Sequence, residues 1–276
     1  MSVSESVGPT RGSNRLLSAN ALLIFAFFYL PIVLLIFLSF NDNRMVGNWG
    51  GASLRWYRAM LVNEQVMNSL RNSLYVAVAS TIVSTVLGTV TAIALERFRF
   101  RGRGAFDGLV YLPVIIPDVT MAVMMLLFFA RAFAMVFSAL GITLSLGLTT
   151  ITLSHIAFNI SFVAIVVRAR LAGLDPALDE AAADLYAGKW QAFRHVTLPL
   201  IMPGVLDGAL LALTLSLDDV VITSFVSGPG STTLPVYVFG LVRRGVTPLI
   251  NAVSTVMLAA SMLLVLLSLL VQRRSQ

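Results

Sequence analysis

The chain has 276 residues, of which 58% are hydrophobic and only 12% are charged, and its formal net charge at pH 7 is +6. Soluble domains carry about 25% charged residues, so much of this chain, with a mean hydropathy of +0.89, is expected to face lipid. The composition excludes a disordered chain, which would be poor in apolar residues. The absence of cysteine and the presence of only two histidines exclude a disulfide framework, a thiolate metal site and a histidine-rich metal centre.

Six apolar stretches are long enough to cross a bilayer, which takes about 20 mostly apolar residues. The predicted spans are 16–40, 70–95, 107–130, 148–169, 200–224 and 250–272. The first has a basic start like a signal peptide, but it is too long for one and lacks a small-residue cleavage site, so we expect a retained helix. The predicted fold class is an all-α polytopic membrane protein with six transmembrane helices and short tails at 1–15 and 273–276.

The distribution of lysine and arginine predicts the orientation. With the N-terminus in the cytoplasm, the inside segments hold twelve basic residues and the outside segments seven, with Arg131 counted in an outside loop. The strongest signal is the segment 96–104, which has four arginines. An even number of spans then places both termini in the cytoplasm, the polar segment 41–69 outside and the segment 171–199 inside. No lysine or arginine is expected deep in a span.

Two patterns inside the spans concern packing. Small residues recur every four positions in the second span, at Ser80, Ser84, Gly88 and Ala92. Such a strip lets helix backbones approach closely in lipid, with channel lining as the alternative. Prolines fall within spans at Pro31, Pro113 and Pro117. They predict kinks, and for 112–118 both a functional bend and a plain packing kink remain open.

The inside segment predicts a helical hairpin. Asp175 followed by Pro176 is typical of a helix start, with Asp as the N-cap. The alanine-rich segment that follows is expected to be helical up to Gly188, and a second short helix over 189–196 is expected to end before Pro199. The acids of the first helix are Asp175, Asp179, Glu180 and Asp184. They suit a protein partner better than an anionic lipid surface.

The hairpin resembles the signature loop of the permeases of binding-protein-dependent ABC importers. The matching residues, at the spacing of that loop, are Glu180, Ala181, Ala182, Tyr186, Val196, Leu198 and Pro199. The one departure is Tyr186, where the family normally has a glycine in the turn between two short helices. The resemblance implies a type I ABC importer permease fold within 16–272, with a core at about 68–272, and a coupling loop at 171–199 that inserts into a groove of an ATPase.

The same resemblance implies the partners and the location. The expected partners are a second permease subunit, a different chain, together with two copies of an ABC ATPase subunit and a periplasmic or extracellular substrate-binding protein. The turn-rich loop 226–235 is a candidate contact for the binding protein. The expected location is the cytoplasmic (inner) membrane of a bacterium. ATP and magnesium are expected on the ATPase chains, because this chain lacks a Gly-x-x-x-x-Gly-Lys-Ser/Thr loop. No cofactor and no nucleic acid are expected here.

Within the family the chain is similar to the spermidine/putrescine permease branch, in the segments 113–123 and 215–255. Permeases for iron, thiamine and sulfate share the scaffold and remain alternatives. The resemblance therefore implies alternating-access transport of a small solute, with a polyamine as the first candidate.

The acids of the predicted spans support a cationic solute. They are Asp118, Asp207, Asp218 and Asp219. Each costs about 2.5–3.5 kcal/mol in a membrane unless it faces a cavity or a partner. Carboxylates bind ammonium groups, and aromatic faces add cation–π contacts, with Tyr237, Phe225 and Phe239 as candidates. The alternative is that these acids cap helices or pair with arginines of a second subunit.

The four residues selected as substrate-pathway candidates are Asp218, Asp219, Asp118 and Tyr237. Consecutive residues on a helix point about 100° apart, so Asp218 and Asp219 are expected to differ in role. One of them is a candidate for the substrate, and the other for a helix cap or a neighbouring chain.

Two other classes of function are weighed against a permease. An intramembrane protease would need a nucleophile and a base, for which Ser154 and His155 could be imagined, but no Gly-x-Ser-x-Gly turn supports them. We expect His155 to be a helix-packing hydrogen-bond donor rather than a proton relay. An autonomous channel or secondary transporter would leave the 180–199 loop without a purpose. The chain is therefore expected to be a transporter subunit and not an enzyme.

Overall fold

The computed structural model describes residues 11–45, 47–175, 177–184, 186–245 and 247–274. Pro176 and the side chains of Asp179 and Glu180, on which part of the hairpin prediction rests, lie outside the described residues. The described chain is helical, and its one β interaction is an isolated antiparallel bridge between Asn41 and Ala52. The helices are α1 (Arg11–Ser39), α2 (Arg55–Val62), α3 (Glu64–Arg97), α4 (Arg103–Ile115), α5 (Asp118–Leu140), α6 (Leu148–Ala172), α7 (Ala177–Asp184), α8 (Lys189–Ala192), the π-helical turn η1 (Phe193–Thr197), α9 (Leu198–Asp218), α10 (Val221–Val226), α11 (Leu234–Arg244) and α12 (Pro248–Arg274).

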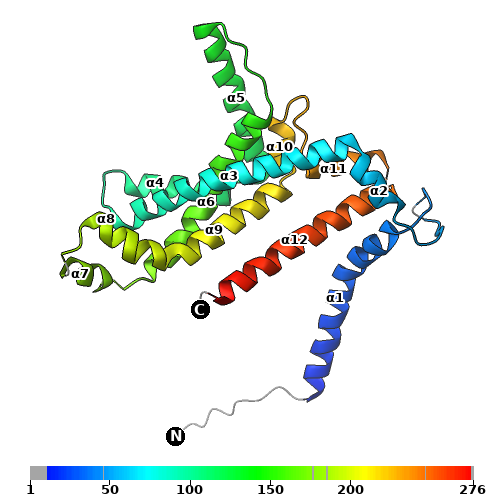
Figure 1. The fold of residues 1–276 in the computed structure, drawn as a ribbon, viewed down its shortest axis with the longest axis horizontal. Helices are drawn as coiled ribbons and strands as arrows, with labels where there is room; N and C mark the ends of the chain where they lie inside the picture. Colours follow the sequence, from blue (N-terminus) through cyan, green and yellow to red (C-terminus); the bar gives the residue numbers. More distant parts are fainter. Residues whose placement is uncertain (1–10, 46, 176, 185, 246, 275–276) are drawn as a thin grey trace.

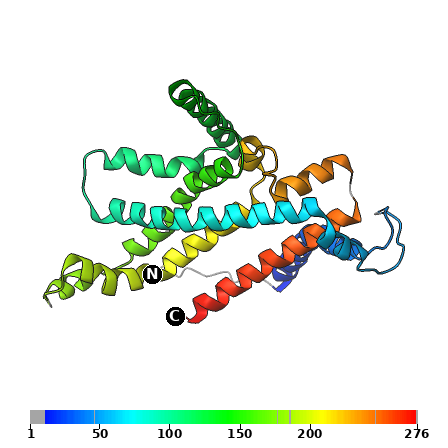
Figure 2. The same ribbon diagram turned by 45° about the horizontal axis from the view of Figure 1, so that its top comes forward.

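Three long helices, α3, α6 and α9, lie side by side and form the centre of the molecule (Figures 1 and 2). The short helices α7 and α8 lie at one end of this bundle, and α2 and α11 lie at the other. Helices α1 and α5 stand away from the bundle, and α12 runs from the α11 end back in the direction of the hairpin (Figure 1). The two ends of the bundle therefore carry separate structures, a hairpin at one and a group of short helices at the other.

The close approach of the three central helices depends on small side chains. The strip predicted in the second span is buried along α3. A Cβ added at Gly88 would lie 2.7 Å from Val163 Cβ and 2.9 Å from the Ile160 carbonyl oxygen of α6. The hydroxyl of Ser80 forms a hydrogen bond with the hydroxyl of Ser216 on α9, with the two oxygens 2.9 Å apart. The predicted close packing of this strip is confirmed.

An ion cluster joins the ends of three helices near the hairpin. Arg168 of α6 donates from Nε to Glu96 of α3 at 3.0 Å and from Nη1 to Asp107 of α4 at 2.5 Å. All three side chains are about one quarter to one third exposed, at 24%, 30% and 31%. Because one guanidinium binds two carboxylates, the cluster holds α4 against both α3 and α6.

Five helices of the described residues are long and apolar enough to cross a membrane. They are Leu17–Ser39, Glu64–Arg97, Asp118–Leu140, Leu148–Ala172 and Lys189–Asp218. The predicted first, second and fourth spans fall on such helices. The sixth prediction, 250–272, falls on α12, whose described apolar part is the shorter segment Pro248–Leu263. An all-α, multi-pass protein is thus confirmed, whereas six spans with cytoplasmic termini remain a prediction.

The predicted span at 107–130 is wrong as a single helix. Helix α4 ends at Ile115, Ile116 is extended with ψ 132°, and α5 begins after Pro117. A proline disfavours the helical conformation in the residue before it and lacks the amide proton that would continue the ladder. The result is a break between two helices, of which α5 projects away from the bundle (Figure 1).

This break also corrects the placement of Arg131. Sequence patterning put it in an outside loop, but it lies in the second half of α5, where its side chain is exposed. Arg131 thus lies within a helix that is long and apolar enough to cross a membrane, and not in a loop. The predicted fifth span, 200–224, is likewise divided, because α9 ends at Asp218 and α10 begins at Val221.

The α2/α11 end of the bundle is predicted to face the outside of the cell, and the hairpin end is predicted to face the cytoplasm. Asn48 and Arg101 lie beyond the two ends of α3, and Lys189 lies in the hairpin on the Arg101 side. Single cysteines placed at these exposed positions in this cysteine-free chain should label differently. An impermeant reagent applied from outside intact cells should modify the Asn48→Cys variant and neither Arg101→Cys nor Lys189→Cys. Outside labelling of Arg101→Cys would contradict the orientation.

Candidate functional site

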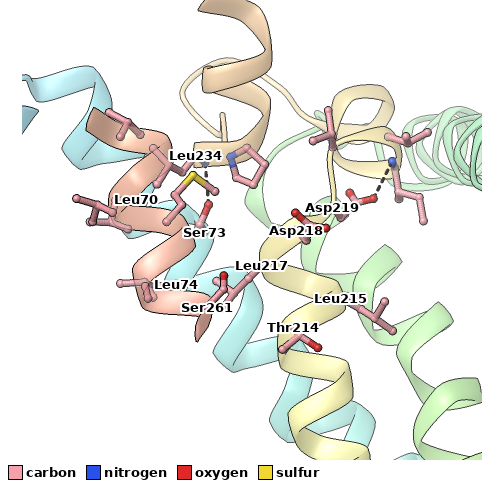
Figure 3. Close-up of a pocket in the computed structure, with 18 of the residues that line it drawn as sticks. Leu70, Ser73, Leu74, Thr214, Leu215, Leu217, Asp218, Asp219, Leu234 and Ser261 are labelled. Atoms are coloured by element: carbon pink, nitrogen blue, oxygen red, sulfur yellow. Dashed lines mark hydrogen bonds between the residues drawn. The ribbon is translucent and has the colours of Figure 1, made fainter. Parts of the chain in front are cut away.

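A cavity of about 770 Å³ opens among the helices at the end of the bundle opposite the hairpin. Its walls come from α3, α9, α11 and α12, with contributions from residues of α2, α4, α5, α6 and α10 (Figure 3). Most of the lining is aliphatic, including Leu70, Leu74, Leu217 and Met257. Its size and apolar walls are typical of a pocket for a small molecule.

The charged residues of the described lining are three aspartates: Asp118, Asp218 and Asp219. The structure thus brings together, at one cavity, three of the four acids that the sequence singled out. Asp118 lies in the first turn of α5, where the positive end of the helix dipole stabilises a carboxylate. Asp207 lies about three turns from Asp218 along α9 and does not line this cavity.

Asp219 caps helix α10. Its Oδ2 accepts from the Thr223 amide and from the Thr223 hydroxyl, both at 2.7 Å, and its Oδ1 accepts from the Ile222 amide at 3.2 Å. The residue is extended, with ψ 125°, so the chain leaves α9 here and starts α10. The side chain of Asp219 is 11% exposed. The oxygens of Asp219 are therefore engaged mainly with the start of α10 and stabilise the change from α9 to α10.

Asp218 differs from its neighbour, as the helical geometry predicts. It is the last residue of α9, its side chain is exposed, and in Figure 3 it extends on the cavity side of the helix end, away from the α10 amides that Asp219 binds. The C-terminal end of a helix carries partial negative charge. The carboxylate and the helix end together make this wall of the cavity attractive to a cation.

The aromatic candidates do not join the acids. Tyr237 packs with Val66, Leu234 and Val253 and donates its hydroxyl to Gln65 Oε1 at 3.3 Å, outside the cavity lining. Phe225 is exposed, and Phe239 stacks under the guanidinium of Arg243 at 4.6 Å. These residues were selected because they follow Asp219 closely in sequence, and the turn after α10 carries Tyr237 and Phe239 away from it.

Phe158 and Phe162 of α6 are the aromatic residues of the cavity lining, and sequence reasoning missed them. Their rings are 6.4 Å apart at 88°, an edge-to-face pair. A spacing of four residues on a predicted span, one turn beyond His155, is a signal that could have found them. They place aromatic surface beside the acids, where a cation could use it.

A buried polar network fixes the helix end that carries these acids. His155 is fully buried and bonds Ser216 through Nδ1 at 2.5 Å and Thr223 through Nε2 at 3.0 Å, with Asp219 Oδ2 at 3.4 Å from Nε2. The Thr223 hydroxyl donates its one proton to Asp219, so it accepts from Nε2–H of His155. His155 has the helix-packing role predicted from its place in the fourth span.

These contacts bring a serine, a histidine and an aspartate together, as in a hydrolase. The serine, however, is Ser216 and not Ser154, whose hydroxyl donates to the Thr150 carbonyl at 2.9 Å. Ser216 is only 6% exposed, shares its hydroxyl with Ser80 and is not part of the cavity lining. A nucleophile in that position has no access to a substrate bond.

The hairpin at the other end of the bundle is built from α7, α8 and η1. Asp175 accepts from the Ala177 amide at 2.9 Å, which confirms the predicted N-cap. Gly188 is not the stop of α7, which ends at Asp184, but the residue that precedes α8. The second short helix does not end before Pro199 either. The wider π turn, with the Leu198 amide bonded to the Phe193 carbonyl, carries the chain directly into α9 and places Pro199 in its first turn.

Tyr186 occupies the turn of the hairpin in a left-handed conformation, with φ 58°. It is the one non-glycine residue with positive φ among those that the structure describes, and its side chain is 97% exposed. A side chain in this conformation costs about 1–2 kcal/mol, which a glycine avoids. The turn geometry is therefore the one that favours glycine at this position, and Tyr186 retains it at an energetic cost.

A shallow groove of about 520 Å³ lies inside the hairpin. Its walls bring together most of the residues predicted for the coupling loop, namely Ala181, Ala182, Tyr186 and Val196, while Leu198 and Pro199 begin α9 beyond it. Ala182 is buried and Ala181 is exposed. Small residues on α7 leave this surface open to a partner.

Comparison with known proteins places the chain in a family. Residues 84–276 match the binding-protein-dependent transport system inner membrane component family. The chain belongs to this family. It is 44% identical over 240 residues to the putrescine transport system permease protein PotI of Escherichia coli K12, covering 87% of this chain and 84% of that protein. It is 39% identical over 250 residues to the spermidine/putrescine transport system permease protein PotC of the same strain, covering 91% of each. Identity to PotC of Haemophilus influenzae is 38%, over 94% of this chain and 96% of that one.

Solved structures share the fold. A bacterial ABC transporter involved in the import of alginate superposes with a TM-score of 0.73 at 20% identity, covering 95% of each chain. The MetNI methionine ABC transporter gives a TM-score of 0.60 at 20% identity, covering 78% of this chain and 100% of that one. The fold is that of ABC importer transmembrane subunits. The chain is a multi-pass transport permease and not an enzyme.

The two neighbouring aspartates should differ in their effect on stability. Asp219→Ala removes the cap of α10 and the partner of Thr223, so we expect a loss of about 1–2 kcal/mol. Asp218→Ala, the matched control, removes an exposed carboxylate and should leave stability unchanged. Thermal unfolding of the purified variants in detergent measures both. Equal stability of the two variants would contradict the capping role.

Proposed function

We propose that the chain is a transmembrane subunit of an ATP-driven importer that carries polyamines across the cytoplasmic membrane of a bacterium by alternating access. The observation that carries the substrate assignment is the cavity lined by Asp118, Asp218 and Asp219, with Phe158 and Phe162 beside them. The names of the similar permeases, putrescine and spermidine/putrescine transport proteins, support the same assignment.

The cavity suits the chemistry of a polyamine. Such a molecule has ammonium groups separated by methylene chains. Asp218 offers a charge-assisted bond to one ammonium at the negative end of α9, and Phe158 and Phe162 offer aromatic faces. The aliphatic lining, such as Leu70 and Leu217, receives the methylene segments. A ligand with charged ends and an apolar middle therefore matches both kinds of wall.

The residues that line the cavity also indicate which of the alternative solutes it could bind. Sulfate is an anion and finds no lysine or arginine among the described residues of the cavity wall. Iron needs several ligands in one place, and no group of three or more His, Cys, Asp or Glu that could hold a metal occurs in the described residues. Thiamine is a cation, so it is the alternative that fits the charge and that an uptake assay must distinguish.

The partners follow from the two ends of the bundle. The α7–α8 hairpin is the proposed contact with the ATPase subunits, two in number, which supply the ATP and magnesium sites. A second permease chain covers apolar surface on this subunit, where α1 and α5 are almost entirely unburied. A substrate-binding protein delivers the polyamine from outside. A periplasmic binding protein is present in a solved complex of the similar alginate transporter.

Removing one carboxylate from the cavity tests the substrate assignment. Asp218→Asn keeps the size of the side chain and removes its charge. The lost ammonium contact should raise the half-saturating polyamine concentration about tenfold or more. Asp219→Asn should have the smaller effect, because the oxygens of Asp219 are engaged with α10. Uptake of labelled putrescine, spermidine and thiamine by reconstituted complexes measures this. Wild-type uptake of every solute by the Asp218→Asn complex would remove the support for a polyamine.

A double substitution in the hairpin tests coupling to the ATPase. Glu180→Lys with Ala182→Trp reverses a charge and fills the space beside Val196 in the groove. Because close approach of the ATPase is prevented, uptake should be lost or uncoupled from ATP hydrolysis, while the chain still inserts into the membrane. The conservative pair Glu180→Gln with Ala182→Ser is the control. Full uptake by the Lys/Trp variant would contradict the role of the hairpin.

A further inference from the structure

Tyr186 is almost fully exposed at the turn of the hairpin, where it forms part of the wall of the groove. In the described residues its side chain makes no hydrogen bond and no ring contact, and 97% of its surface is exposed. Its backbone is nevertheless held at φ 58°, where a glycine would be free of strain. A strained conformation with no compensating internal contact indicates that the side chain serves an external one.

The surroundings of Tyr186 are those of a protein-binding surface. Trp190, on the next helix, is 69% exposed, with its ring 5.5 Å from that of Phe193. Beside these aromatic residues lies the groove whose walls include Ala181 and Ala192. Exposed tyrosine and tryptophan next to a small-residue groove are typical of the anchor positions of interfaces. The hairpin also lies at the end of the molecule, clear of the other helices (Figure 1).

The charge of the hairpin argues for a protein and against lipid headgroups. Between positions 175 and 195 the chain has four acidic residues and two lysine or arginine residues. Segments that bind anionic lipid surfaces are instead rich in lysine and arginine. An aromatic side chain on an acidic hairpin is therefore better matched to a pocket in a protein partner.

We infer that Tyr186 is an anchor of the contact between this chain and its ATPase subunit, with the ring entering an apolar pocket of that subunit. The inference rests on the proposed function, because it takes the ATPase as the partner of the hairpin. It adds that this chain binds its ATPase partly through an aromatic side chain at the turn.

Three substitutions separate an anchor from a merely tolerated residue. Tyr186→Phe keeps the ring, Tyr186→Ala removes it, and Tyr186→Gly removes it while relieving the backbone strain. Complexes of the full chain with its second permease subunit, in lipid nanodiscs, are titrated with the purified ATPase. The Phe variant should bind like wild type, and the Ala and Gly variants should both bind at least about fivefold more weakly. Uptake at a limiting ATPase concentration should fall in the same order.

The glycine variant decides the question. If Tyr186→Gly binds the ATPase as well as wild type or better, the ring makes no contact and the inference is overturned. Tyr75→Ala, which removes an exposed tyrosine of α3, controls for loss of an aromatic side chain elsewhere. If the wild-type complex itself binds no ATPase, the proposed function fails. If wild type binds and all three Tyr186 variants bind equally, only the anchor fails.

Discussion

The carboxylate of Asp219 is the interaction on which the arrangement of the cavity depends. It accepts hydrogen bonds from two backbone amides of α10 and lies against His155 of α6. His155 in turn forms a hydrogen bond with Ser216 of α9. Through Ser216 the network reaches Ser80 of α3. One buried chain of hydrogen bonds therefore ends α9, begins α10 and fixes both against the two other central helices. The position of Asp218 at the mouth of the cavity is a consequence.

The division of labour between Asp218 and Asp219 follows from helix geometry. Two consecutive acids at a helix end cannot point the same way. The one that follows the last helical residue is placed to bind the amides of the next helix, and the one before it remains exposed. A single pair of acids thus supplies a structural cap, Asp219, and a charged group in the cavity, Asp218. The described lining contains no basic residue that would neutralise Asp218.

The hairpin and the cavity are joined by one continuous helical segment. The chain runs from Lys189 through the π turn and α9 to Asp218 without leaving the helical conformation. Pro199 has no amide proton to donate in any conformation, and the wider π turn before it relieves the crowding of its ring against the preceding turn. This segment is a physical link between the proposed ATPase contact at one end and the acidic wall at the other, about 30 residues apart.

The sequence by itself determined the all-helical membrane class, the close packing at Gly88, the cap at Asp175 and the family. These depend on local composition and spacing, which are properties of the chain before it folds. Two limits of the same reasoning are the single span at 107–130 and the helix end before Pro199. At 107–130 the apolar run is continuous, but Pro117 ends the helix within it. At Pro199 the π turn before α9 places the proline in a first helical turn, where it is tolerated.

Only the tertiary structure decided which residues share the cavity. Phe158 and Phe162 come from a helix some 60 residues from Asp218 in sequence, and they reach the acids because α6 packs on α9 and α10. Tyr237, much closer in sequence, is carried away by the turn that follows α10. The sequence could identify acids that are costly in a membrane, but neighbours across a bundle depend on how helices pack, and local patterns do not contain that information.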